Sequence, residues 1–102
     1  MQHAAYENSV NHGWWEPPPE DGTVISLIHK EVSEVLDTLR TCTSHHESQK
    51  IPGFSNLEEE LADVILQVMV FAERKKVRLG AAVAAKHEFN KKRPHRHGGK
   101  AF

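Results

Sequence analysis

Four carboxylates, arranged as two pairs, are the side chains whose types and spacing are best suited to chemistry. Glu31 and Glu34 lie in "HKEVSEVL", and Glu60 and Asp63 lie in "EEELADVI". Each pair has i, i+3 spacing, which places both carboxylates on one face of a helix. Each pair also lies in or beside an apolar stripe, where unpaired charge is costly. Oxygen ligands on two facing helices favour Mg²⁺, with Mn²⁺ as the alternative, over a thiol-loving metal.

Three further side chains near the C-terminus could complement such a metal site. Lys86, Asn90 and Arg93 follow i, i+4, i+7 spacing, so they share one face of a helix that we expect over residues 81–92. A phosphate chain bound to the metal would reach toward this face. The alternative is that the basic C-terminal residues are simply solvated.

Length, charge and cysteine content limit the class of protein. The chain has 102 residues, which predicts a single domain over residues 1–102. Residues 1–63 carry a charge of −9 and residues 64–102 carry +8, so an acidic wall can face a basic wall. A net charge of −1 argues against nucleic-acid binding. One cysteine, a polar N-terminus and no membrane-length apolar run predict a soluble cytoplasmic protein with no membrane partner.

Helical periodicity dominates the middle of the chain. Apolar residues at helical spacing predict an amphipathic helix that starts with Asp21 as its N-cap and ends near Arg40. Ser55 and Glu58 form a capping-box pattern, which predicts a second helix that reaches about Lys76. Its centre, "LADVILQVMVFA", is apolar on nearly every side, which predicts a partner helix from another subunit. The expected fold is an all-α helical bundle completed by oligomerisation.

Two adjacent tryptophans precede these helices. Trp14 and Trp15 lie in "HGWWEPPPEDG", where the prolines favour an extended path. Either ring could fill the core or a subunit interface, and either could stack on a nucleobase, a contact worth about 1–3 kcal/mol. Residues 3–11 fit a short helix, and residues 41–54 lack periodicity and are expected to form a loop.

The acidic pairs and both ends of the chain resemble the MazG-like all-α nucleoside triphosphate pyrophosphohydrolases of the small single-domain type. The pairs look like the ExxE…ExxD signature of that family, and "NHGWWEP" and "KHEFNKKRPHRHGGKAF" also look like its members. The resemblance implies an all-α dimer, or a tetramer built from dimers. It implies Mg²⁺-dependent hydrolysis of (d)NTP to (d)NMP and pyrophosphate. The implied role is nucleotide-pool house-cleaning with a preference for deoxynucleotides.

The resemblance also assigns roles by position. Glu31, Glu34, Glu60 and Asp63 would hold the metal, and either Glu31 or Glu34 would activate the attacking water. Many family members carry a second acid directly before the first motif glutamate, whereas this chain has Lys30, which puts the assignment of the base in doubt. The implied phosphate contacts are Lys86, Asn90 and Arg93, and the implied base contacts are Trp14 and Trp15.

Two other classes of protein are compatible with parts of this pattern. A non-catalytic helical module that binds a nucleotide or a partner helix would explain the apolar helix and Lys30, and it would bind nucleotide without phosphate chemistry. A ferritin-like di-metal bundle requires Glu-x-x-His pairs. Neither acidic pair has a histidine at the matching position, so this class ranks last.

Overall fold

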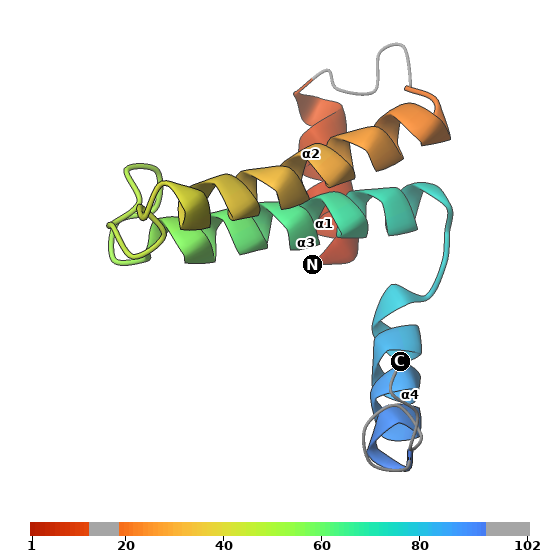
Figure 1. The fold of residues 1–102 in the computed structure, drawn as a ribbon. Helices are drawn as coiled ribbons and strands as arrows, with labels where there is room; N and C mark the ends of the chain where they lie inside the picture. The colour runs from red at the N-terminus through yellow and green to blue at the C-terminus, as the bar shows by residue number, and fades with distance from the viewer. Residues whose placement is uncertain (13–18, 94–102) are drawn as a thin grey trace.

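The computed structural model describes residues 1–12 and 19–93, which form helices joined by loops (Figure 1). Within these residues there are no strands, apart from one isolated bridge between Glu47 and Ser55. The predicted all-α class is therefore confirmed. No helix in the described ranges is long and apolar enough to cross a membrane. The helices are α1 (Gln2–Asn11), α2 (Asp21–Arg40), α3 (Asn56–Arg74) and α4 (Leu79–Lys91).

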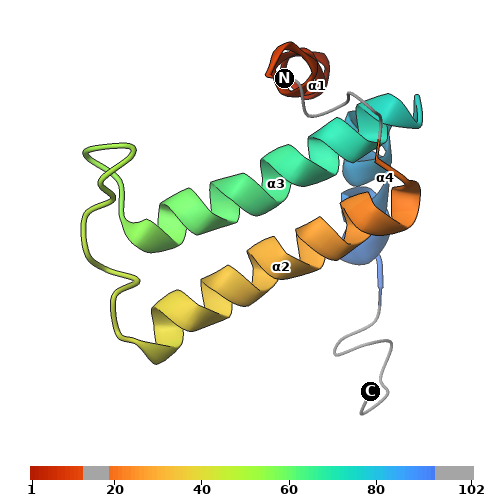
Figure 2. The ribbon, with the colours of Figure 1, turned by 90° about the horizontal axis from the view of Figure 1, so that it is seen from above.

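Helices α2 and α3 lie side by side and antiparallel, joined by residues 41–55 (Figure 2). The predicted capping box fixes where α3 begins. The hydroxyl of Ser55 accepts a hydrogen bond from the backbone N–H of Glu58 at 3.1 Å, and the carboxylate of Glu58 accepts one from the N–H of Ser55 at 2.9 Å. Two backbone donors at the helix start are satisfied in this way. The first acid of α3 therefore has a fixed position along the hairpin.

Loss of this cap should weaken the whole protein. We expect Ser55→Ala to lower the free energy of unfolding by about 1 kcal/mol, because the N–H of Glu58 loses its acceptor. Urea denaturation followed by circular dichroism measures the change. Ser26→Ala is the matched control, since the Ser26 hydroxyl only donates to the Gly22 carbonyl within α2. An equal loss of stability in both variants would show that the cap contributes nothing specific.

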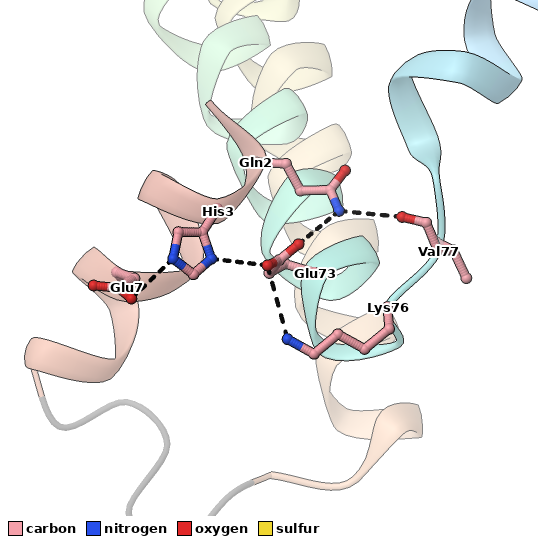
Figure 3. A network of polar contacts seen from close by, with 6 residues as sticks. All are labelled: Gln2, His3, Glu7, Glu73, Lys76 and Val77. Atoms are coloured by element: carbon pink, nitrogen blue, oxygen red, sulfur yellow. Dashed lines mark hydrogen bonds and ion pairs between the residues drawn. The ribbon is translucent and has the colours of Figure 1, made fainter.

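Helix α1 packs across α3 and completes a small core (Figure 2). Val24 of α2 and Val70 of α3 form its buried centre. A polar network holds α1 to the end of α3 (Figure 3): the carboxylate of Glu73 contacts His3 Nδ1 at 2.8 Å and accepts a bond from Gln2 Nε2 at 3.0 Å. These hydrogen bonds from His3 and Gln2 lower the pKa of Glu73. The partly buried residues packed against the core are Ala5, Tyr6, Val10 and Phe71.

Several predicted helix boundaries differ from the structure by one or two residues, including both ends of α4, which was expected over residues 81–92. Asp21 is the first residue of α2, and the N-cap is Glu20, which makes no side-chain capping bond. The carboxylate of Asp21 instead accepts a hydrogen bond from Lys75 Nζ at 2.9 Å, and this contact lowers the pKa of Asp21. Helix α3 ends at Arg74 and not near Lys76, because Lys76 adopts a left-handed conformation with φ of 56°.

Helices α2 and α3 leave an apolar face uncovered in the single chain. Among the described residues, Val24, Val70 and Ala72 are the only buried apolar side chains. Exposed apolar side chains on both helices are candidates for an interaction surface. They are Ile25, Val32, Leu36 and Leu39 on α2, and Leu61, Ile65 and Leu66 on α3.

Candidate metal centre

Three carboxylates meet where α2 and α3 face each other. Glu31 comes from α2, and Glu60 and Asp63 come from successive turns of α3. Each offers one oxygen atom, and these three atoms all lie within 4.8 Å of one another. The antiparallel hairpin thus brings together side chains that are about thirty residues apart in the sequence. Such a cluster of half-buried oxygen donors can hold a hard divalent cation.

Burial and mutual repulsion shift the pKa values of this carboxylate trio, which we define as Glu31, Glu60 and Asp63. Burial raises the pKa of Glu31, and the charges of Glu34 and Asp63 raise it further. Burial also raises the pKa of Glu60, with Glu34 and Asp63 as the next causes. The pKa of Asp63 is raised by burial and then by the charge of Glu59. Three acids that resist ionisation together indicate a place where a cation is favourable.

The surroundings of one carboxylate oxygen indicate whether the trio is suited to bind a metal ion. Oε2 of Glu60 is buried and has no hydrogen-bond partner among the described residues. A buried carboxylate oxygen without a partner is costly, since its lone pairs have lost water and gained nothing in return. A divalent cation held by the trio would satisfy this oxygen. The residues present therefore fit Mg²⁺ or Mn²⁺.

Glu34, the fourth predicted ligand, lies beside the trio but outside it. Its charge raises the pKa of Glu31 and of Glu60, and a side-chain hydrogen bond with Glu34 also raises that of Glu60. Its side chain remains 39% exposed, and Lys30 Nζ lies 3.9 Å from its Oε1. The structure therefore separates Glu34 from Glu31, which the sequence analysis could not do. Lys30 therefore acts as a counter-charge to Glu34.

A cation from the α2–α3 loop also lies near the trio, and the sequence analysis missed it. The buried hydroxyl of Ser48 donates to the carboxylate of Glu59 and accepts the backbone N–H groups of Lys50 and Ile51, each at 3.1 Å. Lys50 Nζ lies 3.7 Å from Glu59 Oε2. Its charge offsets part of the rise in pKa of Asp63. The run of three glutamates before Leu61 was the only sequence signal for Glu59.

The predicted phosphate-binding residues do not reach the trio within one chain. Lys86, Asn90 and Arg93 are all exposed, on α4 or just beyond it. Helix α4 projects from the end of the hairpin where α3 finishes (Figure 1), whereas Glu60 and Asp63 lie in the first half of α3. Trp14 and Trp15, the predicted base contacts, lie outside the described residues.

The trio predicts an unusual pH dependence for the metal-free protein. A carboxyl whose folded pKa is raised stabilises the fold at low pH, and this contribution is lost as the pH rises through the folded pKa. Because Asp63 belongs to the trio and its pKa is raised, the stability of wild type relative to Asp63→Asn should increase as the pH falls from about 7 to about 4, toward the ordinary range of carboxyl pKa values. Urea denaturation in chelator at both pH values measures it.

Comparison with the variant cancels the titration of histidines, which occurs in the same pH range. Saturating Mg²⁺ should remove most of the pH dependence of the stability difference between wild type and Asp63→Asn. The reason is that the cation replaces the protons as the partner of the carboxylates. A stability difference that does not change with pH in chelator would contradict the raised pKa values.

The family model of the MazG nucleotide pyrophosphohydrolase domain matches residues 20–98. The match spans α2, α3 and α4, including both acidic pairs, and it does not include α1. The chain therefore belongs to the MazG nucleotide pyrophosphohydrolase family, as its sequence motifs predicted. No curated protein and no solved structure matches the chain.

Proposed function

We propose that this protein is a Mg²⁺-dependent nucleoside triphosphate pyrophosphohydrolase. It would convert a (d)NTP and water into the (d)NMP and pyrophosphate. The proposal rests mainly on the carboxylate trio, in which one oxygen atom from each residue lies within 4.8 Å of the other two. The chain that holds this trio belongs to the MazG family. The partnerless buried oxygen of Glu60 supports a bound cation at this point.

Glu31, Glu60 and Asp63 would hold the metal, with Mn²⁺ as the alternative ion. When bound, the metal would neutralise charge on the phosphates and make a coordinated water more acidic. Side chains of the protein would supply the general base and the remaining contacts to the phosphates. Glu34 is the residue we assign as general base, because its carboxylate lies beside the trio yet reaches solvent. It would take a proton from the attacking water as the α–β phosphoanhydride bond breaks and pyrophosphate leaves.

Lys50 is the one cation that the single chain places beside the trio among its described residues, apart from Lys30 next to Glu34. We assign it to the phosphate chain. The Ser48 hydroxyl fixes the backbone at Lys50, and Glu59 holds the ammonium group on the side of the acids. An ammonium at this position would balance negative charge that develops on the leaving pyrophosphate.

We further propose that the active form is a homodimer, or a homotetramer built from dimers. The exposed apolar side chains of α2 and α3 support this, because a second copy could bury them. The direction of α4 supports it too. Helix α4, which carries Lys86 and Asn90, projects from the far end of the hairpin (Figure 1), so the basic residues on it and Arg93 would contact the phosphates bound by a partner.

The proposed biological role is house-cleaning of the cytoplasmic nucleotide pool, with a preference for deoxynucleotides. Pyrophosphate release from a panel of ribo- and deoxyribonucleoside triphosphates tests the reaction and the preference together. We expect release in Mg²⁺ and none in chelator, with deoxynucleotides cleaved faster. Tight nucleotide binding without any release over long incubation would favour the non-catalytic binding module instead.

A further inference from the structure

A further acid of α3, Glu59, lies next to the carboxylate trio in the helix without belonging to it. Glu59 precedes Asp63 at i, i+4 spacing, so the two side chains share a face of α3. After burial, the charge of Glu59 is the largest cause that raises the pKa of Asp63. The Glu59 side chain is 12% exposed, compared with 39% for Glu34. A largely buried carboxylate therefore adds negative charge at the metal centre without serving as one of its ligands.

Each oxygen atom of the Glu59 carboxylate is held by a group from the loop between α2 and α3. Oε1 accepts a hydrogen bond from the hydroxyl of Ser48, and Oε2 lies 3.7 Å from Lys50 Nζ. The Lys50 side chain is 80% exposed, so this ion pair alone would restrain the carboxylate weakly. Ser48 is buried, which makes its hydroxyl the stronger of the two restraints.

The loop fixes the Ser48 hydroxyl in the orientation that this hydrogen bond requires. Its oxygen accepts the backbone N–H groups of Lys50 and Ile51, each at 3.1 Å, which leaves its single proton to be donated to Glu59. The backbone N–H of Ser48 donates to the carbonyl oxygen of Phe54 at 2.8 Å. Within the described ranges, Ser48 is the only polar residue that is buried. Because every hydrogen-bonding position of the hydroxyl is used, it holds Glu59 in one orientation.

A Glu59 carboxylate that was not held in this way could coordinate a cation bound by the trio, since hard divalent cations take carboxylate oxygens as ligands. A metal ion that also binds phosphate needs coordination positions that water or phosphate can occupy. For this reason Mg²⁺ at phosphate-binding sites is typically held by only a few carboxylates. A further carboxylate at the metal would fill such a position, and its charge would repel the phosphate chain.

We propose that Ser48 is a positioning residue that keeps the carboxylate of Glu59 away from the metal. By holding Oε1, the Ser48 hydroxyl limits the metal ligands on this side of the site to the trio. A coordination position then stays open for the phosphate chain. This inference deepens the proposed function and rests on it, because it requires that a cation be bound by the trio.

A double-mutant cycle on the nucleotide-free, full-length protein tests this role. The variants are Ser48→Ala, Glu59→Gln and the two substitutions together, and calorimetry measures the Kd of each protein for Mg²⁺. Asn56→Ala is the matched control. The Asn56 amide donates to the carbonyl oxygen of Thr43 at 3.0 Å, so this substitution also removes a bond between the loop and α3 but releases no carboxylate. Circular dichroism establishes that each variant keeps its helices.

We expect Ser48→Ala to lower the Kd for Mg²⁺ about tenfold, because an added charged ligand strengthens the binding of a hard cation. In the Glu59→Gln background, Ser48→Ala should leave the Kd unchanged, since the amide carries no charge. Asn56→Ala should bind Mg²⁺ no more tightly than wild type, as expected for a residue that only supports the loop.

Unchanged or weaker Mg²⁺ binding by Ser48→Ala would overturn the inference, because the serine would then be only structural. A gain in affinity that persists in the double variant would overturn it as well, since the added ligand would not be Glu59.

The proposed function and this inference can fail separately. If Ser48→Ala gains Mg²⁺ affinity through Glu59 but wild type hydrolyses no triphosphate, the role of Ser48 stands and the proposed activity does not. If wild type hydrolyses triphosphates and Ser48→Ala gains no Mg²⁺ affinity, the activity stands and the role of Ser48 fails. A folded wild-type protein that binds no Mg²⁺ would overturn both.

Discussion

Replacing Asp63 with asparagine should reduce turnover by about a thousandfold or more and should stabilise the metal-free protein. Both effects have one cause. The amide lacks the charge that the metal requires, so the charge stabilisation of the reaction is lost. The amide also removes a buried negative charge that repels Glu31 and Glu60, whose pKa values its carboxylate raises. Steady-state pyrophosphate release and urea denaturation in chelator measure the two effects.

Asp37→Asn is the matched control for this substitution. Asp37 is exposed near the end of α2 and is not part of the trio, so the control should keep full turnover and unchanged stability. A stabilised but inactive Asp63→Asn is the signature of a metal site, since a merely structural carboxylate would lose stability when replaced. Wild-type turnover in Asp63→Asn would refute the site.

Two inactive variants should restore activity when they share one oligomer. Glu60→Gln removes a metal ligand, and the double variant Lys86→Ala, Arg93→Ala removes the basic face near α4. Each should be inactive alone. If the basic face acts on a partner's trio, a mixed dimer contains one intact site. Random reassembly of equal amounts should then give about a quarter of wild-type turnover.

The experiment requires that subunits exchange, so the variants are mixed in urea and refolded together, and light scattering confirms that oligomers re-form. Each variant refolded alone is the control. Recovery in the mixture, and not in the controls, would place trio and basic face on different chains. An inactive mixture of refolded oligomers would show that the basic face does not serve a partner's site.

Local sequence patterns predicted the helices and the carboxylates well. The capping box at Ser55 and the apolar spacing of α2 are encoded within a few residues, and the structure contains both. The i, i+3 spacing of the acids places them on one helical face without any tertiary information. The antiparallel hairpin is then favoured, because two consecutive amphipathic helices bury their apolar faces by packing together.

Features that depend on contacts between distant segments were not predictable in this way. The start of α2 differs from the prediction because Asp21 pairs with Lys75, 54 residues away. Lys50 was missed because its position depends on the bond between Ser48 and Glu59, and no periodic pattern links a loop serine to a helix glutamate. In each case a tertiary interaction overrides or supplements the local preference.

The direction in which α4 projects was the structural feature that the sequence predicted least. The spacing of Lys86, Asn90 and Arg93 predicts that they share one face, but it says nothing about the direction in which that face points, and Arg93 lies beyond the end of α4. The left-handed conformation at Lys76 ends α3, and the residues that follow turn the chain away from the hairpin. A sequence pattern within one chain cannot distinguish a site built from one chain from a site shared between two.

The structure gives Lys30 a role beside Glu34. An acid at this position would add negative charge beside the trio, whereas Lys30 lies 3.9 Å from Glu34 and partly neutralises it. The two side chains are exposed, so the ion pair contributes little to stability. Its effect would be to orient the carboxylate that we assign as the base.

The most direct test of the account is a time course of one deoxynucleoside triphosphate with the wild-type protein, in Mg²⁺ and in chelator, with both products quantified. We expect equal amounts of nucleoside monophosphate and pyrophosphate in Mg²⁺, and no reaction in chelator. Release of orthophosphate and nucleoside diphosphate would contradict cleavage of the α–β bond. Unchanged turnover in chelator would contradict the role of the carboxylate trio.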